Sequence, residues 1–274
     1  MTRKPPKKLL KLLFGKDPIP FNHALPLVPL CVAYGMGWDS TAMLIEMHKR
    51  GVRPDLITFA DTGSEKPETY AYLPVIQQWL ANVGFPPVTV VKLGSKKYSS
   101  LEENCLRNKT LPSLAFGKKG CSLKWKTAPQ NRYRNNWESA RQAWRMNIPV
   151  TVAIGYDAGP QDSKRAQKLC DDRRYRYWYP LREWGLDRNA CKQTILGAGL
   201  PLPMKSACFF CPASKEHEIE WLVRTHPELA DRIVAMEANA KDRLTSIEGL
   251  WRSVPGSMTG LINSKRNLPI VEAA

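Results

Sequence analysis

Residues suited to holding an anion gather in one turn near the start of the chain. Between an apolar run and a helical pattern stand, in order, Tyr34, Gly35, Met36, Gly37, Trp38, Asp39, Ser40 and Thr41. Glycines let the backbone approach an anion closely, and a helix N-terminus offers unpaired N–H groups. Ser40 and Thr41 add hydroxyl donors, while Asp39 can hold Mg²⁺ or orient the loop. The alternative is that Asp39 or Ser40 merely caps the helix.

A second polar turn follows the next apolar run. Asp61, Thr62 and Gly63 form it, and Glu68 opens the helical pattern that comes after. Ligands of parallel sheets bind at the carboxyl ends of the strands, so two such turns on neighbouring strands are expected to face one crevice. The alternative is an ordinary β-turn followed by an acidic residue in the first turn of a helix.

Four cysteines form a candidate metal site. Cys208 and Cys211 make a CxxC followed by Pro212, Cys191 precedes them, and Cys121 stands alone after a glycine. A CxxC can chelate one metal ion, act as a redox pair or ligate an iron–sulfur cluster. No thioredoxin-like pattern supports a redox pair. Spacing alone does not separate zinc from [4Fe–4S], and free thiols are the third alternative.

The remaining three of the seven cysteines receive other roles. Cys170 is a reserve ligand or a persulfide carrier, whereas Cys31 and Cys105 are expected to be structural. No secretion signal is recognisable, and no apolar run approaches the roughly 18 residues of a membrane span. We therefore expect a cytoplasmic protein with reduced cysteines and no membrane contact.

Charge and aromatic content point to a polyanionic partner. The chain has 274 residues and a formal net charge of +16, with 43% hydrophobic residues, which is enough for a core. Residues 118–145 interleave Lys and Arg with Trp125, Tyr133, Trp137 and Trp144, and residues 173–179 repeat the theme. Cations can neutralise phosphates and aromatic rings can stack on unpaired bases. A merely solvated basic surface, with the rings in the core, is the alternative.

Strand-like and helix-like segments alternate through the first half. Strands are expected at 27–34 (paired from Leu30, because Pro29 cannot donate), 54–59, 88–91 and 150–155, with helices at 41–49 and 67–83. Alternation of this kind predicts an α/β fold with a doubly wound parallel sheet. We expect a basic flexible arm at 1–22, a nucleotide-binding domain at 23–186 and a helical, cysteine-bearing region at 187–274.

Four blocks together resemble a known superfamily. They are the turn at 34–41, the turn at 61–70, the Cys121-x-x-Lys124 segment, and Ile154-Gly155-Tyr156-Asp157 with Arg165. In this order they resemble the PP-loop ATP pyrophosphatases, and within them the phosphoadenosine phosphosulfate (PAPS) reductase-like branch, over residues 28–215. The cysteine pattern is similar to that of the Fe–S DNA phosphorothioation sulfurtransferases. One departure is that Gly35 and Met36 replace the first two residues of the family loop Ser-Gly-Gly-x-Asp-Ser.

The resemblance implies a fold, an activity and a set of site residues. It implies an adenine nucleotide alpha hydrolase-like fold in which a substrate atom attacks the α-phosphate of ATP and pyrophosphate leaves. Asp39, Ser40 and Lys124 would be catalytic. ATP and Mg²⁺ would be held by Gly35, Gly37, Asp39, Ser40, Thr41, Asp61, Thr62, Gly63, Glu68, Gly155, Asp157 and Arg165. Cys121, Cys191, Cys208 and Cys211 would ligate a [4Fe–4S] cluster, with zinc as the alternative.

The function expected from these residues is an ATP-dependent, Fe–S sulfurtransferase acting on nucleic acid, either tRNA or DNA. It would need a sulfur donor such as a cysteine desulfurase, and partner subunits are compatible with it. A sulfonucleotide reductase is the second reading. That family carries a nucleophilic cysteine in a C-terminal Glu-Cys-Gly-x-His tail, whereas the last cysteine here is Cys211. The third reading is a non-catalytic nucleotide- or nucleic-acid-binding subunit of a modification or defence system.

Overall fold

A computed structural model describes residues 28–95, 97–251 and 256–266, so the arm expected at 1–22 lies outside the described residues. The chain divides into two compact units. The first comprises the described parts of Met1–Ala60, Pro67–Val91 and Gln130–Ser206, and the second comprises those of Asp61–Lys66, Lys92–Pro129 and Ala207–Ala274. These ranges differ from the expected 23–186 and 187–274, because residues 187–206 fall in the first unit and residues 61–66 and 92–129 in the second.

A parallel sheet forms the centre of the first unit, as the sequence predicts, and it has five strands where the sequence predicted four. Its strands run in the order β3-β2-β1-β4-β5. Their bounds are β1 (Leu30–Ala33), β2 (Leu56–Asp61), β3 (Val88–Lys92), β4 (Val150–Ile154) and β5 (Tyr175–Trp178). Parallel pairing sets Cys31 opposite both Leu56 of β2 and Val152 of β4. The chain changes direction of travel between β1 and β4, and this switch point is where open α/β sheets bind ligands.

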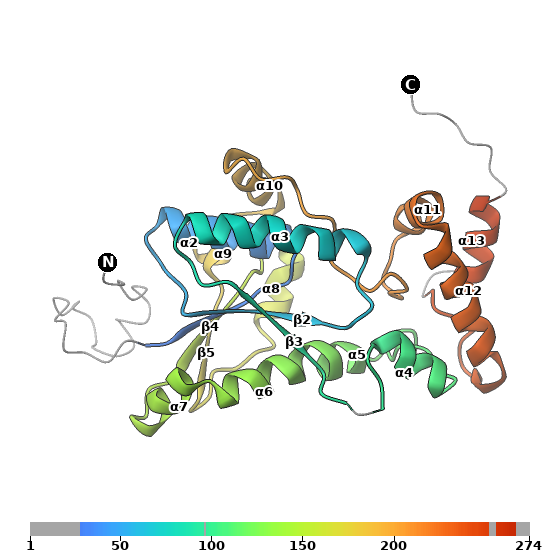
Figure 1. Cartoon of the computed structure of the whole chain (residues 1–274), viewed down its shortest axis with the longest axis horizontal. Helices are drawn as coiled ribbons and strands as arrows, with labels where there is room; N and C mark the ends of the chain where they lie inside the picture. The colour runs from blue at the N-terminus through green and yellow to red at the C-terminus, as the bar shows by residue number, and fades with distance from the viewer. Residues whose placement is uncertain (1–27, 96, 252–255, 267–274) are drawn as a thin grey trace. The chain divides into compact units, whose positions relative to one another are not determined.

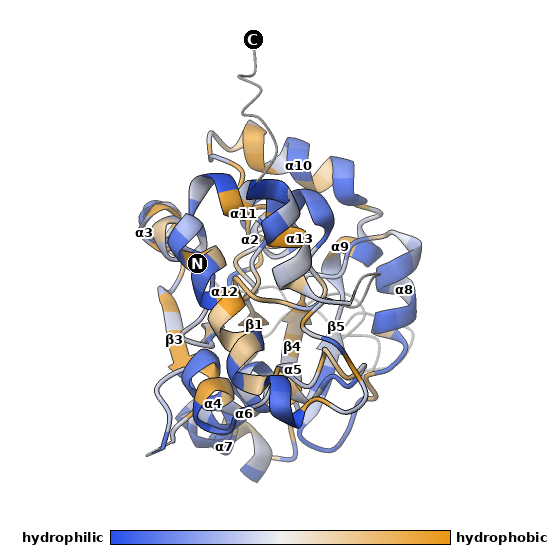
Figure 2. Ribbon diagram, turned by 90° about the vertical axis from the view of Figure 1, so that its right-hand side faces the viewer, coloured by the Kyte–Doolittle hydropathy of each residue, from blue (hydrophilic) through white to orange (hydrophobic). Residues whose placement is uncertain are grey.

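Two layers of helices cover the sheet (Figure 1). On one side lie α2 (Trp38–Lys49), α3 (Pro67–Asn82), α9 (Pro180–Glu183) and α10 (Arg188–Gly197), and on the other α6 (Ala128–Asn136) and α7 (Glu138–Arg145). The α/β class with helices on both faces is therefore confirmed. A further short helix, α8 (Pro160–Ala166), is coloured as hydrophilic in Figure 2.

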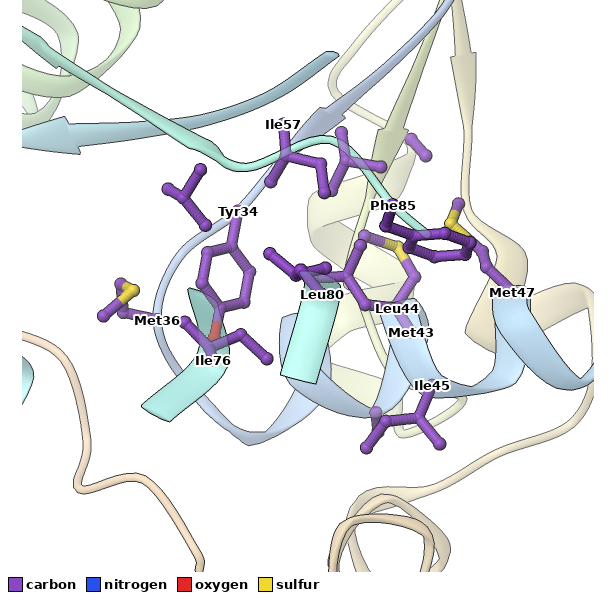
Figure 3. Packing of buried hydrophobic residues seen from close by; sticks show 14 of the residues in the cluster. Tyr34, Met36, Met43, Leu44, Ile45, Met47, Ile57, Ile76, Leu80 and Phe85 are labelled. Atoms are coloured by element: carbon purple, nitrogen blue, oxygen red, sulfur yellow. The ribbon is translucent and has the colours of Figure 1, made fainter. Parts of the chain in front are cut away.

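Apolar residues of α2 and α3 make the core on the first face. Met43, Leu44 and Met47 of α2 are fully buried against Ile57 of β2 and Ile76 of α3 (Figure 3). Their spacing of one, three and four residues places them on one side of the helix. The core thus fixes the N-terminus of α2 directly after β1.

The second face of the sheet has a smaller core, and this core contains one of the cysteines. Cys31 of β1 is buried with Val152 of β4, Tyr175 of β5 and Ala140 of α7. Burial raises the pKa of the Cys31 thiol, and the Arg134 guanidinium lowers it by a smaller amount, so the net shift is upward. Cys31 is a core thiol, as expected.

The second unit is mostly helical and has its own core. It contains α4 (Leu101–Arg107), α5 (Gly120–Ser122), the π-helix η1 (Leu123–Thr127), α11 (Glu216–Thr225), α12 (Pro227–Ala240), the 3₁₀ turn η2 (Lys241–Arg243) and α13 (Met258–Arg266). The buried Glu237 carboxylate accepts backbone N–H groups from Leu250 and Met258 at 2.5 and 2.9 Å, which fixes the chain between α12 and α13. No helix in the described ranges combines the length and apolar character needed to cross a bilayer.

Candidate functional site

Ser40 organises the turn that joins β1 to α2. Its hydroxyl accepts the N–H groups of Gly35 and Gly37 at 3.2 and 3.3 Å and can donate to the Gly37 carbonyl at 3.2 Å. Thr41 is fully buried, and its hydroxyl lies 3.0 Å from the Tyr34 hydroxyl. The amides of the turn therefore converge on one side chain at the start of a helix, an arrangement suited to an anion.

Met36 stands in this turn in the left-handed region, with a φ of 58°. That conformation is costly for a residue with a side chain. The Met36 side chain is fully buried in the core beside Tyr34 and Ile76 (Figure 3), so packing offsets the strain. The departure from the family loop is thus accommodated by anchoring the turn in the core.

Gly155 allows β4 to end against the beginning of α2. A Cβ atom at Gly155 would lie 2.8 Å from the Ser40 Cα and backbone N and 3.0 Å from the Asp39 carbonyl carbon. Side chains do not approach backbone this closely, so only glycine fits. The two segments predicted to bind nucleotide are therefore brought together at the switch point of the sheet.

We expect Gly155→Ala to destabilise the protein by about 1–3 kcal/mol, as overpacking does. It should also weaken binding of a non-hydrolysable ATP analogue by about tenfold or more, because 1.4 kcal/mol is a factor of ten. Urea unfolding and calorimetric titration measure the two effects. Gly197→Ala is the matched control, since a Cβ there meets nothing within 4 Å. Equal behaviour of the two variants would show that the approach of β4 to α2 is unimportant.

Three carboxylates meet at the same end of the sheet. Asp39 of α2, Asp157 after β4 and Asp162 of α8 have ligand oxygens within 4.8 Å of one another. Among the described residues, no other three His, Cys, Asp or Glu side chains come this close together. Arg188 donates to both Asp39 oxygens at 2.8 Å, and Arg165 donates to Asp162 at 2.8 Å. Sequence reasoning missed Asp162, whose place in the first turn of a helix resembles that of an ordinary helix acid.

The charges of this cluster oppose ionisation of Asp39. Burial raises the pKa of the Asp39 carboxyl, Arg188 lowers it, and the neighbouring Asp157 and Asp162 raise it further, so that the net shift is upward. Ionised Asp39 therefore costs the folded state stability as the pH rises through its raised pKa. A divalent cation would remove that cost, because Mg²⁺ prefers carboxylate oxygens.

We expect millimolar Mg²⁺ to raise the melting temperature near neutral pH by about 2–4 °C, the shift typical of 1 kcal/mol for a protein of this size. The increment should shrink below about pH 5, where protons compete for the carboxylates. The Asp39→Asn variant should not show this Mg²⁺-dependent rise in melting temperature. Asp187→Asn, which removes one carboxylate but keeps the cap on Ala190, is the control. Identical Mg²⁺ shifts in both variants would contradict a metal site at Asp39.

Aromatic rings border this end of β4. Tyr156 stacks on Tyr179 with centroids 5.6 Å apart and planes 5° apart, and the Arg165 guanidinium lies 4.5 Å from the Tyr156 centroid. Burial raises the pKa of Tyr179 to about 12. Arg165, a sequence-predicted residue, thus contacts both Asp162 and Tyr156, and the tyrosine pair was not foreseen.

Glu68, another predicted residue, lies on α3 beside a cavity of about 490 Å³ in the first unit. Trp38, Tyr72 and Val75 share the lining with Glu68. The Trp38 indole donates to the Pro203 carbonyl at 2.7 Å, which fixes one wall. Glu68 therefore borders the same helix N-terminus as the Ser40 turn.

The Asp61–Gly63 turn belongs to the second unit. Asp61 accepts the Gly63 N–H at 2.7 Å and pairs with Lys92 at 2.9 Å. The Thr62 hydroxyl donates to Glu65 at 3.1 Å and lies 3.3 Å from the Cys208 sulfur. Of these three predicted nucleotide-binding residues, Thr62 lies next to a cysteine.

A lysine that sequence reasoning missed is paired inside the second unit. Lys126 lies 2.7 Å from Glu65, whose side chain is fully buried. Burial acts to lower the pKa of Lys126, but Glu65, Cys208 and Cys211 together raise it, so it is held as a cation. Lys124, the predicted catalytic lysine, is exposed and lies 5.7 Å from the Tyr98 ring. Both lysines sit in one basic run, and only packing distinguishes them.

The predicted cysteine ligands are divided between the units. Cys121, Cys208 and Cys211 belong to the second unit, whereas Cys191 is fully buried in the main core of the first. The second-unit thiols suit a metal or cluster, because Thr62 and Lys126 supply the hydroxyl and the positive charge that stabilise bound thiolates. Burial raises the pKa of the Cys208 thiol, so metal binding there must displace a proton. Cys170 is exposed.

The basic, aromatic stretch of the first unit is only partly a surface. Trp178 is 7% exposed, and its indole donates to Glu183 at 2.7 Å, so this residue cannot stack on a base. Strand β5, which contains it, was not foreseen. Arg173 and Arg174 are exposed, with Arg174 over the Trp144 ring at 5.1 Å, and Tyr133 of α6 is 40% exposed.

Comparisons with known proteins give one distant structural likeness. No protein-family model matches the chain, and no curated protein matches it. Among solved structures, the chain is similar to the U34-tRNA thiolase NcsA from Methanococcus maripaludis with its [4Fe–4S] cluster, at 13% identity and a TM-score of 0.45. That match covers 95% of this chain and 77% of the thiolase. A likeness at this level carries no argument about activity.

Proposed function

We propose that the protein is an ATP-dependent sulfurtransferase that activates a nucleic acid by adenylation, releases pyrophosphate and uses an Fe–S centre. The observation that carries the proposal is the site at the β1/β4 switch point. There the Ser40-organised turn, the N-terminus of α2, three carboxylates and Arg165 lie together. Anion donors beside a set of Mg²⁺ ligands are what a nucleoside triphosphate requires.

Each residue has a role that follows from its contacts. The N–H groups of Gly35 and Gly37 and the Ser40 hydroxyl would bind the β- and γ-phosphates. Asp39, with its neighbouring carboxylates, would hold Mg²⁺ once Arg188 releases it. Fixed donors of this kind stabilise the charge that develops on leaving pyrophosphate.

The cysteines of the second unit would hold the centre. Cys121, Cys208 and Cys211 provide three ligands, and the sequence expectation gives Cys191 as the fourth. When bound, a [4Fe–4S] cluster would supply iron able to take up sulfur for transfer; zinc is the alternative. Lys126 and Thr62 would orient the Cys208 and Cys211 thiolates and offset their charge.

The test uses the full chain, purified anaerobically. We expect a broad absorbance near about 400 nm with about four irons per chain. We also expect Mg²⁺-dependent pyrophosphate release from ATP that tRNA or DNA stimulates. Binding of ATP without turnover under any condition would favour the non-catalytic subunit instead. Reduction of PAPS or adenylyl sulfate would favour the reductase.

A further inference from the structure

A fourth cysteine, Cys105, lies in the second unit with Cys121, Cys208 and Cys211. It is on α4, whose start is tied to the segment that contacts the CxxC. The Leu101 N–H donates to the Thr62 carbonyl at 2.9 Å, and the Thr62 hydroxyl lies 3.3 Å from the Cys208 sulfur. One residue thus connects the first turn of α4 to a predicted ligand.

Ser64 makes a second connection between α4 and the CxxC. Its hydroxyl accepts the Glu102 N–H at 3.1 Å, and its carbonyl accepts the Phe209 N–H at 3.0 Å. Arg232 joins the same two residues, because it donates to Glu102 at 2.8 Å and its guanidinium lies 4.7 Å from the Phe209 ring. Helix α4 and the CxxC are therefore held in a fixed relation.

Cys105 is placed on the inner side of this assembly. It follows Leu101 by four residues, so the two side chains share one face of α4. Both are buried, at 1% and 5% exposure, in the same hydrophobic cluster as Cys208, and Cys121 packs against that cluster. Cys105, Cys121 and Cys208 therefore belong to one packed cluster of the second unit.

Cys191 has different surroundings. It is fully buried in the hydrophobic core of the first unit, on α10, which packs along α2. Burial is the first cause that raises the pKa of its thiol to about 12, and the Asp39 and Asp157 carboxylates are the next. A thiol enclosed in an apolar core has the properties of a small hydrophobic side chain.

We propose that Cys105 supplies the fourth thiolate of a metal centre whose other ligands are Cys121, Cys208 and Cys211, and that Cys191 is a structural core residue. The inference rests on the proposed Fe–S centre and changes its ligand set. Four thiolates from one folded unit complete the coordination of a [4Fe–4S] cluster. They need no ligand from the other unit.

The experiment compares single cysteine variants of the full chain, purified anaerobically and reconstituted with iron and sulfide. Cys105→Ala should reduce iron and sulfide content and the absorbance near about 400 nm at least as strongly as Cys121→Ala does. Cys191→Ala and Cys31→Ala, which also remove buried thiols, should retain both. Far-ultraviolet circular dichroism checks folding. Cys105→Ser keeps the size of the side chain and should alter the electron paramagnetic resonance spectrum of the reduced protein even if Cys105→Ala fails to fold.

The outcomes separate this inference from the proposed function. Loss of the cluster in Cys191→Ala together with full retention in Cys105→Ala and an unchanged spectrum in Cys105→Ser would overturn the ligand assignment alone. Wild-type protein that contains zinc and no iron would overturn the Fe–S proposal. In that case cobalt substitution counts the thiolates, and a weaker sulfur-to-cobalt absorption in Cys105→Ala than in Cys191→Ala supports the assignment. Wild-type protein that binds no metal after reconstitution overturns both.

Discussion

Replacing Ser40 with alanine is expected to lower the rate of ATP-dependent pyrophosphate release by about 100- to 1000-fold, the usual effect of removing one fixed donor from an anion site. The reason lies in two hydrogen bonds. The Ser40 hydroxyl gathers the N–H groups of Gly35 and Gly37, so its loss removes a donor to the phosphates and also disperses two amides. The variant therefore loses more than a helix cap.

Asp39→Ala should have an equally large effect for a different reason. Without Asp39 the carboxylate trio loses the member that lies on α2, and Arg188 loses the oxygens that it contacts at 2.8 Å. Arg188 is then left as an extra positive charge where Mg²⁺ should bind. The expected loss is in turnover and Mg²⁺ dependence, while the fold is retained, because Asp39 lies outside the core.

The measurement is pyrophosphate release under saturating ATP and Mg²⁺, with thermal unfolding of each variant recorded in parallel. Ser139→Ala on α7 is the control, since it removes a serine hydroxyl from the same unit. If Ser40→Ala and Asp39→Ala both turn over ATP at the wild-type rate, the nucleotide does not bind at the β1/β4 switch point. A fall in melting temperature without loss of turnover would reduce Ser40 to a structural cap.

The strands that could be predicted are the ones with simple apolar runs. Residues 27–34 gave β1, and the pairing begins at Leu30 as expected because the residue before it is a proline. Strand β5 was missed because it has no simple apolar run: Arg176 stands between Tyr175 and Tyr177. Tyr175 and Trp178 are buried in two different cores while Arg176 remains half-exposed, and a sequence does not say which of its aromatic residues will be buried.

The candidate site was predictable where a local motif carries it and not where distant segments meet. The Gly35–Thr41 turn was found from its own residues. Asp162 and Arg188 could not be predicted as site residues, because each resembles an ordinary helix residue in the sequence. Their contacts with Asp39 depend on how α8 and α10 pack in the fold. Lys126 differs from Lys124 only in its pairing with Glu65, which is far away in the sequence.

The boundaries of the two units could not be predicted from the sequence either. Residues 61–66 begin at the last residue of β2, and periodicity alone gives no reason to group them with residues 92–129 and 207 onwards. Hydrogen bonds such as that from Phe209 to Ser64 make the grouping. The link between α4, which carries Cys105, and the CxxC could not be predicted for the same reason, since it depends on the contacts of Thr62 and Ser64 in the fold.

Replacing Arg173, Arg174 and Arg176 together with glutamine should weaken nucleic-acid binding and its dependence on salt. Each phosphate contact contributes about 0.7–0.9 to the slope of log K against log salt, so the triple variant should lower that slope by about two. ATP affinity should hardly change, because none of the three contacts the carboxylate trio. Arg176 already donates to the Asp172 carbonyl at 2.7 Å, so Arg173 and Arg174 should account for most of the effect.

The measurement is filter binding of single-stranded and duplex nucleic acid from about 50 to 300 mM salt, the range in which counterion release dominates. A control that replaces Lys215, Arg224 and Lys241 changes the net charge equally, and all three are exposed residues of the second unit. Equal losses in both triple variants would indicate non-specific attraction by a strongly basic protein. A specific surface requires the 173–176 variant alone to lower the slope.

Tyr133→Ala distinguishes stacking from charge on the same unit. Its ring is 40% exposed, whereas Trp178 is held in the core, so Tyr133 is an aromatic residue able to meet an unpaired base. The change should cost about 1–3 kcal/mol with single strands and much less with duplex, whose bases hide their faces, and it should leave the salt slope intact. If neither Tyr133→Ala nor the triple arginine variant alters affinity, the acceptor of the proposed adenylation is a small molecule, and the +16 charge reflects only a solvated surface.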